Sequence, residues 1–404
     1  MTFGAPKTAR RGWLIGPALV AGVAYLDPGN VATNMSAGAE FGYLLVWVVV
    51  LGNAMAWLIQ YLSAKLGVVS GRSLAQTLGE RIRSPWSRRL FWLQAELVAM
   101  ATDVAEVIGG AVALWILFDV PLVWGGVVTG AVSMALLAVQ SRGGARPFEG
   151  VIVALMAVIA IGFVAGVFVG PPSEAAVAEG LVPRFAGSES VLLAASILGA
   201  TVMPHAIYAH SALTRDRFDG VPLPRVMRAT RWDVTIALAI AGTVNLAILL
   251  LGAANLPGVP GTDSLEGAYA ALRDSLGAIV ATLFAVGLLA SGLASTSVGA
   301  YAGSEIMSGL LRIRVPLLAR RLVTIVPALA ILAAGVDPTR ALVLSQVVLS
   351  FGIPFALVPL VWFTAQRRTL GSLRNRWWTT ALGAAASAFL IALNVVLLVM
   401  TLGG

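Results

Sequence analysis

Two apolar stretches of the sequence are interrupted by side chains that could ligate a cation. In the first, Asp27, Pro28, Gly29 and Asn30 follow one another inside residues 13–38. Proline removes a backbone donor and glycine relaxes the backbone, so we expect a helix to break here. The break would present the oxygens of Asp27 and Asn30 at membrane depth, where irregular backbone is tolerated only around a buried site or a wet cavity. The alternative is a proline kink with an incidental capping aspartate.

The second interruption lies inside residues 190–213, where Pro204 follows Met203 and precedes His205. Carboxylate and amide oxygens suit hard cations, whereas a thioether favours softer ones. The oxygens of the first interruption together with the Met203 sulfur would bind Mn²⁺, Fe²⁺, Co²⁺ or Cd²⁺ and penalise Ca²⁺ and Mg²⁺. Methionine as core filler is the alternative reading.

A third group of polar residues lies on one predicted helix over residues 89–114. At 100° per residue, Glu96, Asp103 and Glu106 share one face of that helix. A row of carboxylates inside a membrane indicates a proton or cation path, because such groups cost roughly 2.5–3.5 kcal/mol each to insert. The alternative is helix packing with buried counter-ions. Arg320 and Arg321 are candidate partners, although they could equally be membrane-interface anchors.

The composition requires these sites to lie in a membrane. Of 404 residues, 58% are hydrophobic and only 11% are charged, which is too few charges to cover a water-soluble core. The chain has no cysteine, which excludes disulfides and thiolate metal sites. Apolar runs long enough to cross a hydrocarbon core of about 30 Å predict eleven spans. They cover approximately residues 13–38, 43–66, 89–114, 121–140, 149–170, 190–213, 232–255, 276–310, 319–336, 341–364 and 377–401.

The basic residues give the predicted spans an orientation. If the N-terminus and every second connection lie inside, all but three of the 27 Lys and Arg residues fall on the inner side; the exceptions are Arg184, Arg273 and Arg340. This predicts an inner N-terminus and an outer C-terminus. The net charge of +8 is therefore a topology signal and not a nucleic-acid patch. Five spans separate the two interruptions, so the two halves should insert with opposite orientation, an arrangement typical of transporter binding sites.

With both interruptions and the acidic third span, the chain resembles the Nramp family of proton-coupled divalent metal transporters. The resemblance extends over nearly the whole chain. Further shared motifs are Ala32-Thr33-Asn34, Phe41-Gly42-Tyr43, Ala101-Thr102-Asp103-Val104-Ala105-Glu106, Ala300-Tyr301-Ala302-Gly303, Ser345-Gln346 and Phe351-Gly352-Ile353-Pro354-Phe355. The chain departs from the family pattern at Leu293, Ser304 and Ala206. It retains Met203, which a Mg²⁺-carrying branch of the superfamily lacks.

The resemblance implies an all-α, LeuT-like fold in one transmembrane domain over residues 1–404. Residues 13–170 and 190–364 would be inverted repeats of five spans each, and 377–401 an added helix. It also implies a metal site and a proton route. The implied metal ligands are Asp27, Asn30, the Ala200 carbonyl and Met203, with Gln346 joining in some states. The implied proton route comprises Asp27, His205, Asp103, Glu106 and Glu96, with Arg320 and Arg321 beyond.

We therefore expect a cell-membrane importer of divalent metal ions and protons that works by alternating access, as a monomer and without a resident cofactor. A sodium-coupled carrier of organic solutes and a passive channel are the alternatives within transport. An enzyme is not expected, because the sequence has no Gly-x-Ser-x-Gly or His-Glu-x-x-His motif and neither Lys7 nor Lys65 lies in a Walker loop.

Overall fold

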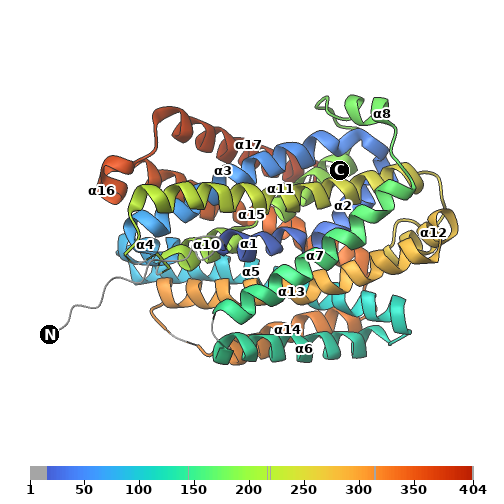
Figure 1. Ribbon diagram of the computed structural model, residues 1–404, viewed down its shortest axis with the longest axis horizontal. Coiled ribbons are helices and arrows are strands. Elements are labelled where there is room, and N and C mark those ends of the chain that lie inside the picture. Colours follow the sequence, from blue (N-terminus) through green and yellow to red (C-terminus); the bar gives the residue numbers. More distant parts are fainter. Residues whose placement is uncertain (1–15, 144, 216, 219, 314, 403–404) are drawn as a thin grey trace.

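The computed structural model is a bundle of long helices that lie roughly along one axis (Figure 1). It describes residues 16–143, 145–215, 217–218, 220–313 and 315–402. Eight helical stretches of the described residues are long and apolar enough to cross a membrane. They are Pro28–Ser70, Pro85–Phe118, Glu149–Val169, Ser188–Arg215, Leu223–Asn255, Ala278–Leu310, Pro338–Ala365 and Trp377–Met400. The expected all-α polytopic membrane fold is confirmed.

Each predicted span corresponds to one helix or to two half-helices. The first span is α1 (Pro17–Val23), the 3-10 turn η2 (Ala24–Leu26) and α2 (Pro28–Phe41), and the sixth is α9 (Ser188–Thr201) and α10 (Pro204–Arg215). The other nine are single helices. They are α3 (Val46–Ser70), α5 (Pro85–Phe118), α6 (Leu122–Gly143), α7 (Ala145–Val169), α11 (Leu223–Asn255), α13 (Ala278–Leu310), α14 (Leu317–Ala333), α15 (Pro338–Ala365) and α17 (Trp377–Leu402).

Several of the predicted helices differ from the length of a bilayer: α5, α11 and α13 are longer, with 34, 33 and 33 residues, and α14 is shorter. The 33 residues of α13 extend about 50 Å at 1.5 Å per residue, so this helix continues beyond a core of about 30 Å, as its long apolar run predicts. The 17 residues of α14 extend only about 26 Å. It lies beside α6 along one edge of the bundle, where both can be followed in Figure 1.

Short helices in the connections were not predicted from the sequence. They are α4 (Leu74–Arg81), α8 (Glu174–Glu179), α12 (Leu265–Leu276), α16 (Arg367–Leu370) and the 3-10 turns η3 (Gly42–Leu45) and η4 (Gly371–Leu373). They lack long apolar runs; local caps start several of them, such as the reciprocal hydrogen bonds of Ser73 and Gln76 at α4. α4 and α16 lie at one end of the bundle and α8 and α12 at the other (Figure 1).

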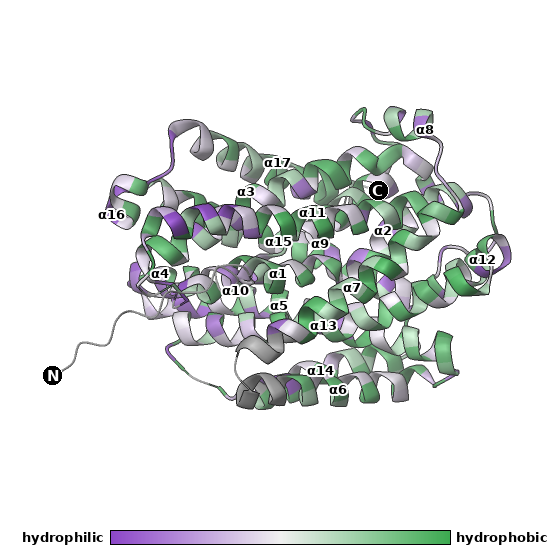
Figure 2. Ribbon diagram, in the orientation of Figure 1, coloured by the Kyte–Doolittle hydropathy of each residue, from purple (hydrophilic) through white to green (hydrophobic). Residues whose placement is uncertain are grey.

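The hydrophilic residues gather at these two ends, and apolar residues dominate the helices between them (Figure 2). Large apolar side chains on the outside of the bundle remain exposed, including Phe168 at 81%, Trp362 at 65% and Val399 at 64%. An exposed apolar surface of this extent is expected of helices surrounded by lipid. The outer surface of the bundle is therefore suited to contact lipid, while the buried polar side chains lie inside it.

Candidate functional site

The first break lies at Asp27, one residue before the proline. The backbone of Asp27 is extended, with φ −70° and ψ 162°, and α2 starts at Pro28. Proline suits the first turn of a helix because its missing N–H has no partner there in any case. One carboxylate oxygen of Asp27 caps α2 by accepting the Asn30 backbone N–H at 2.8 Å. The other oxygen of Asp27 accepts a hydrogen bond from Gln346 on α15.

Gly29 has a different role from the one predicted. We expected it to relax the backbone, but it lies within the first turn of α2 and needs no special conformation. A Cβ atom at this position would lie 1.7 Å from Nε2 and 2.5 Å from Cδ of Gln346 on α15. The absence of a side chain therefore makes room for Gln346, whose Nε2 donates to Oδ2 of Asp27 at 3.2 Å.

The second break faces the first. α9 ends at Thr201, α10 starts at Pro204, and Val202 between them has φ −110° and ψ 61°. The side-chain Nδ2 of Asn30 donates to the Ala200 carbonyl at 3.1 Å and to the Tyr25 carbonyl at 2.6 Å. Two carbonyls freed by the two helix breaks are thus joined by one amide from the first break.

The residues implied as metal ligands are all in the core. Asp27, Asn30, Ala200, Met203 and Gln346 each have 0% exposure. Hydrogen bonds connect four of them, and Met203 lies in the second break, directly before Pro204. Because none is exposed, an ion can reach these atoms only after helices move.

Asp27 is the one carboxylate among the side chains implied as metal ligands. Among the described residues, no group of three or more His, Asp or Glu side chains is placed to hold a metal, so Asp27 would be a single anionic ligand among neutral ones. The Oε1 atom of Gln346 is buried and has no hydrogen-bond partner. A free acceptor oxygen beside a carboxylate fits a cation, because a buried acceptor without a partner is otherwise costly.

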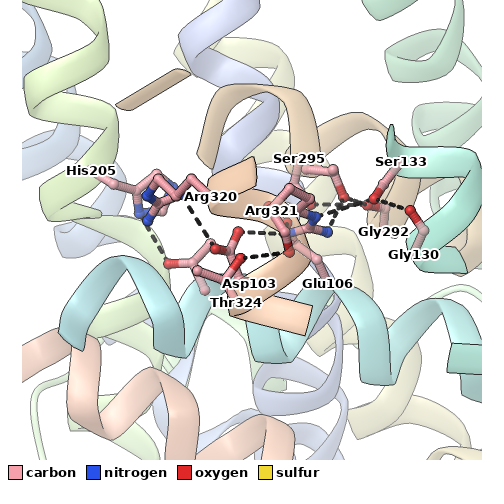
Figure 3. Close-up of polar contacts among 12 residues, drawn as sticks. Asp103, Glu106, Gly130, Ser133, His205, Gly292, Ser295, Arg320, Arg321 and Thr324 are labelled. Atoms are coloured by element: carbon pink, nitrogen blue, oxygen red, sulfur yellow. Dashed lines mark hydrogen bonds and ion pairs between the residues drawn. The ribbon is translucent and has the colours of Figure 1, made fainter. Parts of the chain in front are cut away.

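The acidic residues of α5 meet two arginines of α14 (Figure 3). Arg320 pairs with Glu96 at 2.8 Å and with Asp103 at 3.5 Å. Arg321, which has 0% exposure, pairs with Asp103 and, at 3.1 Å, with Glu106. The predicted carboxylate row therefore lies on one face of α5, and both arginines are buried partners of it instead of interface anchors.

Three neighbours complete this cluster. Arg321 also donates to Ser133 on α6 and to Thr296 on α13, each at 3.2 Å. A Cβ atom on Gly303 would lie 2.1 Å from Cζ of Arg320, so this glycine makes room for the guanidinium. Five charged side chains thus share one buried site in which the carboxylates outnumber the arginines by one.

The two histidines, His205 and His210, contact different helices. His205 lies beside α5, with its Nδ1 atom 3.2 Å from Oγ1 of Thr102, and its Nε2 atom has no partner (Figure 3). The Nδ1 atom of His210 lies 2.7 Å from Oε1 of Gln60 on α3. His205 therefore lies between the second break and the acidic cluster. His210 contacts α3 instead.

The sequence reasoning missed several polar residues that support the breaks. Nδ2 of Asn34 donates to Oδ1 of Asn30 at 2.8 Å, and Nδ2 of Asn245 on α11 donates to the Tyr25 carbonyl at 3.0 Å. Gln60 contacts the Tyr25 hydroxyl. A signal was present for both asparagines: Asn34 follows Asn30 by one helical turn, and Asn245 is a polar residue inside an apolar span.

The two ends of the bundle differ: one contains a cavity with acidic side chains, and at the other a carboxylate fixes the start of α1. At the end with α8 and α12, the lining of a cavity of about 620 Å³ includes four carboxylates, Glu40, Glu189, Asp263 and Asp337, and one arginine, Arg340. At the opposite end, Asp233 on α11 accepts the backbone N–H groups of Gly16 and Ala18 at 3.0 and 2.9 Å, which holds the start of α1 in place.

This arrangement of helices occurs in membrane transporters. The structure of MHP1, a nucleobase-cation-symport-1 family transporter, has a TM-score of 0.59 at 14% identity and covers 96% of this chain and 92% of that one. MhsT in complex with L-phenylalanine has a TM-score of 0.58 at 14% identity, covering 99% of both chains. At this identity the likeness concerns the fold alone, and it confirms the LeuT-like class.

The family is narrower than that class. Residues 18–400 match the family model described as natural resistance-associated macrophage protein-like, and the chain belongs to this Nramp family. It is 60% identical over 397 residues to the divalent metal cation transporter MntH of Mycobacterium tuberculosis (strain ATCC 25618 / H37Rv), covering 97% of this chain and 92% of the relative.

Two further relatives give the same result. MntH of Deinococcus radiodurans is 46% identical over 398 residues, covering 96% of this chain and 90% of the relative. A crystal structure of the Eremococcus coleocola manganese transporter, in complex with an aromatic bis-isothiourea substituted compound, has a TM-score of 0.85 at 33% identity. It covers 98% of this chain and 88% of that one. The predicted family is confirmed.

Proposed function

We propose that this chain is a secondary transporter, not an enzyme, that imports divalent transition-metal ions by alternating access together with protons. Mn²⁺ and Fe²⁺ would be its substrates, with Co²⁺ and Cd²⁺ also accepted. The observation that carries the proposal is the meeting of two broken helices, where Asn30 bridges to the Ala200 carbonyl and Gln346 bonds to Asp27. The names of the MntH relatives support the same substrate class.

In this proposal Asp27, Asn30, Met203, the Ala200 carbonyl and Gln346 ligate the ion. One carboxylate supplies charge, and the thioether of Met203 disfavours Ca²⁺ and Mg²⁺, which gain little from sulfur. The acidic cavity at the α8 and α12 end would raise the local concentration of cations. A membrane potential of 100 mV, negative inside, would add ~2.3 kcal/mol per charge to inward movement.

The test is ion uptake into proteoliposomes that contain the purified protein, measured with Mn²⁺, Fe²⁺, Mg²⁺ and Ca²⁺ while internal pH is followed. Met203→Ala should lose Mn²⁺ uptake and discrimination against Ca²⁺, and Met203→Leu should do the same while keeping the side-chain volume. Met156→Leu on α7 is the matched control, because Met156 is also buried, at 3% exposure, and should behave like the unmodified chain. Unchanged Ca²⁺ discrimination in Met203→Leu would refute the role of the sulfur.

The proton route would run from Asp27 past His205 to the cluster of Asp103, Glu106 and Glu96. His205 lies against α5 next to these carboxylates, and Arg320 and Arg321 would hold them in place. Asp103→Asn and His205→Ala should each reduce metal-driven acidification of the vesicle interior more than they reduce Mn²⁺ binding. Acidification equal to that of the unmodified chain in both variants would remove this route from the proposal.

We also propose that the chain is a monomer in the cell membrane, with the arginine-rich end of the bundle, which is the end with α4 and α16 (Figure 1), in the cytoplasm. The chain contains no cysteine, so single cysteines can be introduced without background labelling. In intact cells, a membrane-impermeant maleimide should label Asp263→Cys and should label Arg83→Cys only after permeabilisation. Both residues lie in connections between helices. The reverse pattern would invert the proposed orientation.

A further inference from the structure

We propose that a cavity at the arginine-rich end of the bundle binds the phosphate group of an anionic phospholipid. The cavity has a volume of about 290 Å³ and lies between the first turns of α5 and the end of α13. Arg88, Arg89 and Trp92 contribute from α5, and Leu311 and Ile313 contribute from the end of α13 and the residues after it. At about 30 Å³ per water molecule, this volume equals roughly ten waters, which is enough for a phosphate ester and part of its hydration.

The charge of the cavity is positive and uncompensated by nearby acids. Arg88 donates one long hydrogen bond, at 3.4 Å, to the Gly79 carbonyl. The Cζ atom of Arg89 lies over the Trp86 ring, 5.1 Å from the ring centroid. The described residues that line the cavity include no carboxylate. The two nearest acids along the chain are engaged elsewhere, since Glu80 pairs with Arg72 and Glu96 with Arg320. Most N–H groups of both guanidiniums therefore remain available to an anion.

The position of the arginines in the helix adds to this preference. Both lie in the first two turns of α5, as the fourth and fifth residues after its N-cap Ser84. The positive end of the helix dipole favours an anion at such a place, although a helix start alone would not make a site. Two arginines also match the planar, bidentate geometry that phosphate oxygens accept.

The surroundings of the cavity indicate that the anion carries hydrocarbon chains. Trp86, Leu90, Leu93 and Leu97 follow one another at helical spacing on α5 and are exposed by 70%, 66%, 46% and 54%. Ile313 at the mouth of the cavity is also exposed, at 54%. In a membrane protein, an apolar stripe of this kind faces acyl chains, and a basic pocket at its end is where lipid headgroups bind. Free phosphate would neutralise the arginines but would leave this apolar wall without a partner.

The binding does not depend on transport, so it can be tested without the function proposed above. The probe is phosphatidylglycerol, titrated onto the purified full chain in neutral detergent, with phosphatidylcholine and inorganic phosphate in parallel. Retention of lipid is measured by native mass spectrometry, and stabilisation by the shift in melting temperature. We expect saturable retention of phosphatidylglycerol, with phosphatidylcholine and inorganic phosphate producing neither retention nor a shift.

Arg88→Gln combined with Arg89→Gln should require about thirtyfold more phosphatidylglycerol for the same occupancy, from the loss of two arginines near an anionic surface. Arg225→Gln combined with Arg228→Gln is the matched control. These two arginines are exposed in the first turns of α11, and neither lines the cavity. The control should shift the titration by less than twofold.

A second variant separates a lost site from a misfolded protein. Leu311→Trp would fill the cavity while keeping both arginines, and it should weaken retention to a similar extent without lowering the melting temperature in the absence of lipid. The proposal is overturned if the Arg88 and Arg89 variant retains lipid like the unmodified chain. It is equally overturned if the Arg225 and Arg228 variant loses as much, or if inorganic phosphate gives the same stabilisation.

Discussion

Gly29→Ala should impair transport while leaving the fold intact. The new Cβ atom would lie 1.7 Å from Nε2 of Gln346, whereas real Cβ atoms keep at least 3.0 Å from such neighbours. The amide must therefore move by at least 1.3 Å, the difference between these two distances. That movement breaks the 3.2 Å hydrogen bond from Gln346 to Asp27. Hydrogen bonds to charged groups contribute about 1.5–3 kcal/mol, so we expect apparent affinity for Mn²⁺ to fall by about tenfold to about a hundredfold.

The stability of this variant should change little. The two closest atoms, Nε2 and Cδ of Gln346, belong to the end of a flexible side chain, and Cγ at 2.9 Å is only slightly too close, so the overpacking cost of about 1–3 kcal/mol lies at its lower end. Alanine also gains up to about 1 kcal/mol over glycine inside a helix. Gly150→Ala on α7 is the control, because a Cβ atom there would meet no atom within 4 Å.

The assay is the concentration dependence of Mn²⁺ uptake into proteoliposomes, with the melting temperature measured on the same preparations. The double variant Gly29→Ala with Gln346→Ala should transport no worse than Gln346→Ala alone, because the clash has no partner left. Two results would refute this reasoning. One is Mn²⁺ uptake by Gly29→Ala that matches the unmodified chain. The other is a loss in Gly29→Ala that adds in full to that of Gln346→Ala.

Three other substitutions probe the surrounding helices. Arg321→Met removes a guanidinium with 0% exposure and strands the carboxylates beside it, so the folded state should lose about 3–5 kcal/mol, measured as a lower melting temperature. Gly303→Ala pushes a Cβ atom to 2.1 Å from Arg320; vesicle acidification should decrease while equilibrium Mn²⁺ binding persists, and a parallel loss of both would contradict this expectation. Gly67→Ala places a Cβ atom 2.2 Å from the Ser211 carbonyl oxygen, a backbone atom that cannot rotate away. This variant should therefore be destabilised by about 1–3 kcal/mol, and a melting temperature equal to that of Gly150→Ala would refute the close packing.

The helices and their two breaks were predictable because the signals are local. Apolar runs gave the spans, and a proline after Asp27 and another after Met203 marked where two of them are interrupted. The short helices α4, α8 and α12 escaped prediction because they lack long apolar runs. Their starts depend on single capping serines such as Ser73, Ser173 and Ser264, which a search for spans does not weigh.

Contacts between distant parts of the chain could not be derived in the same way. The space that Gly29 leaves for Gln346 joins residues more than 300 positions apart, and no periodicity encodes it. Whether Arg320 and Arg321 anchor a membrane interface or pair with the third span depends on how far α14 is shifted along α5. The observed shift buries both arginines against the carboxylates, a result that the sequence left open.

Arg321 also limits which helices can change position relative to one another. From α14 its guanidinium reaches carboxylates of α5, the Ser133 hydroxyl of α6 and the Thr296 hydroxyl of α13. It is a non-covalent crosslink among four helices: sliding α5 against α14 would strand a buried charge at a cost of several kcal/mol, and sliding α6 or α13 would break a hydrogen bond to a buried guanidinium. These four helices should therefore behave as a single rigid frame, relative to which the half-helices around Asp27 and Val202 can shift.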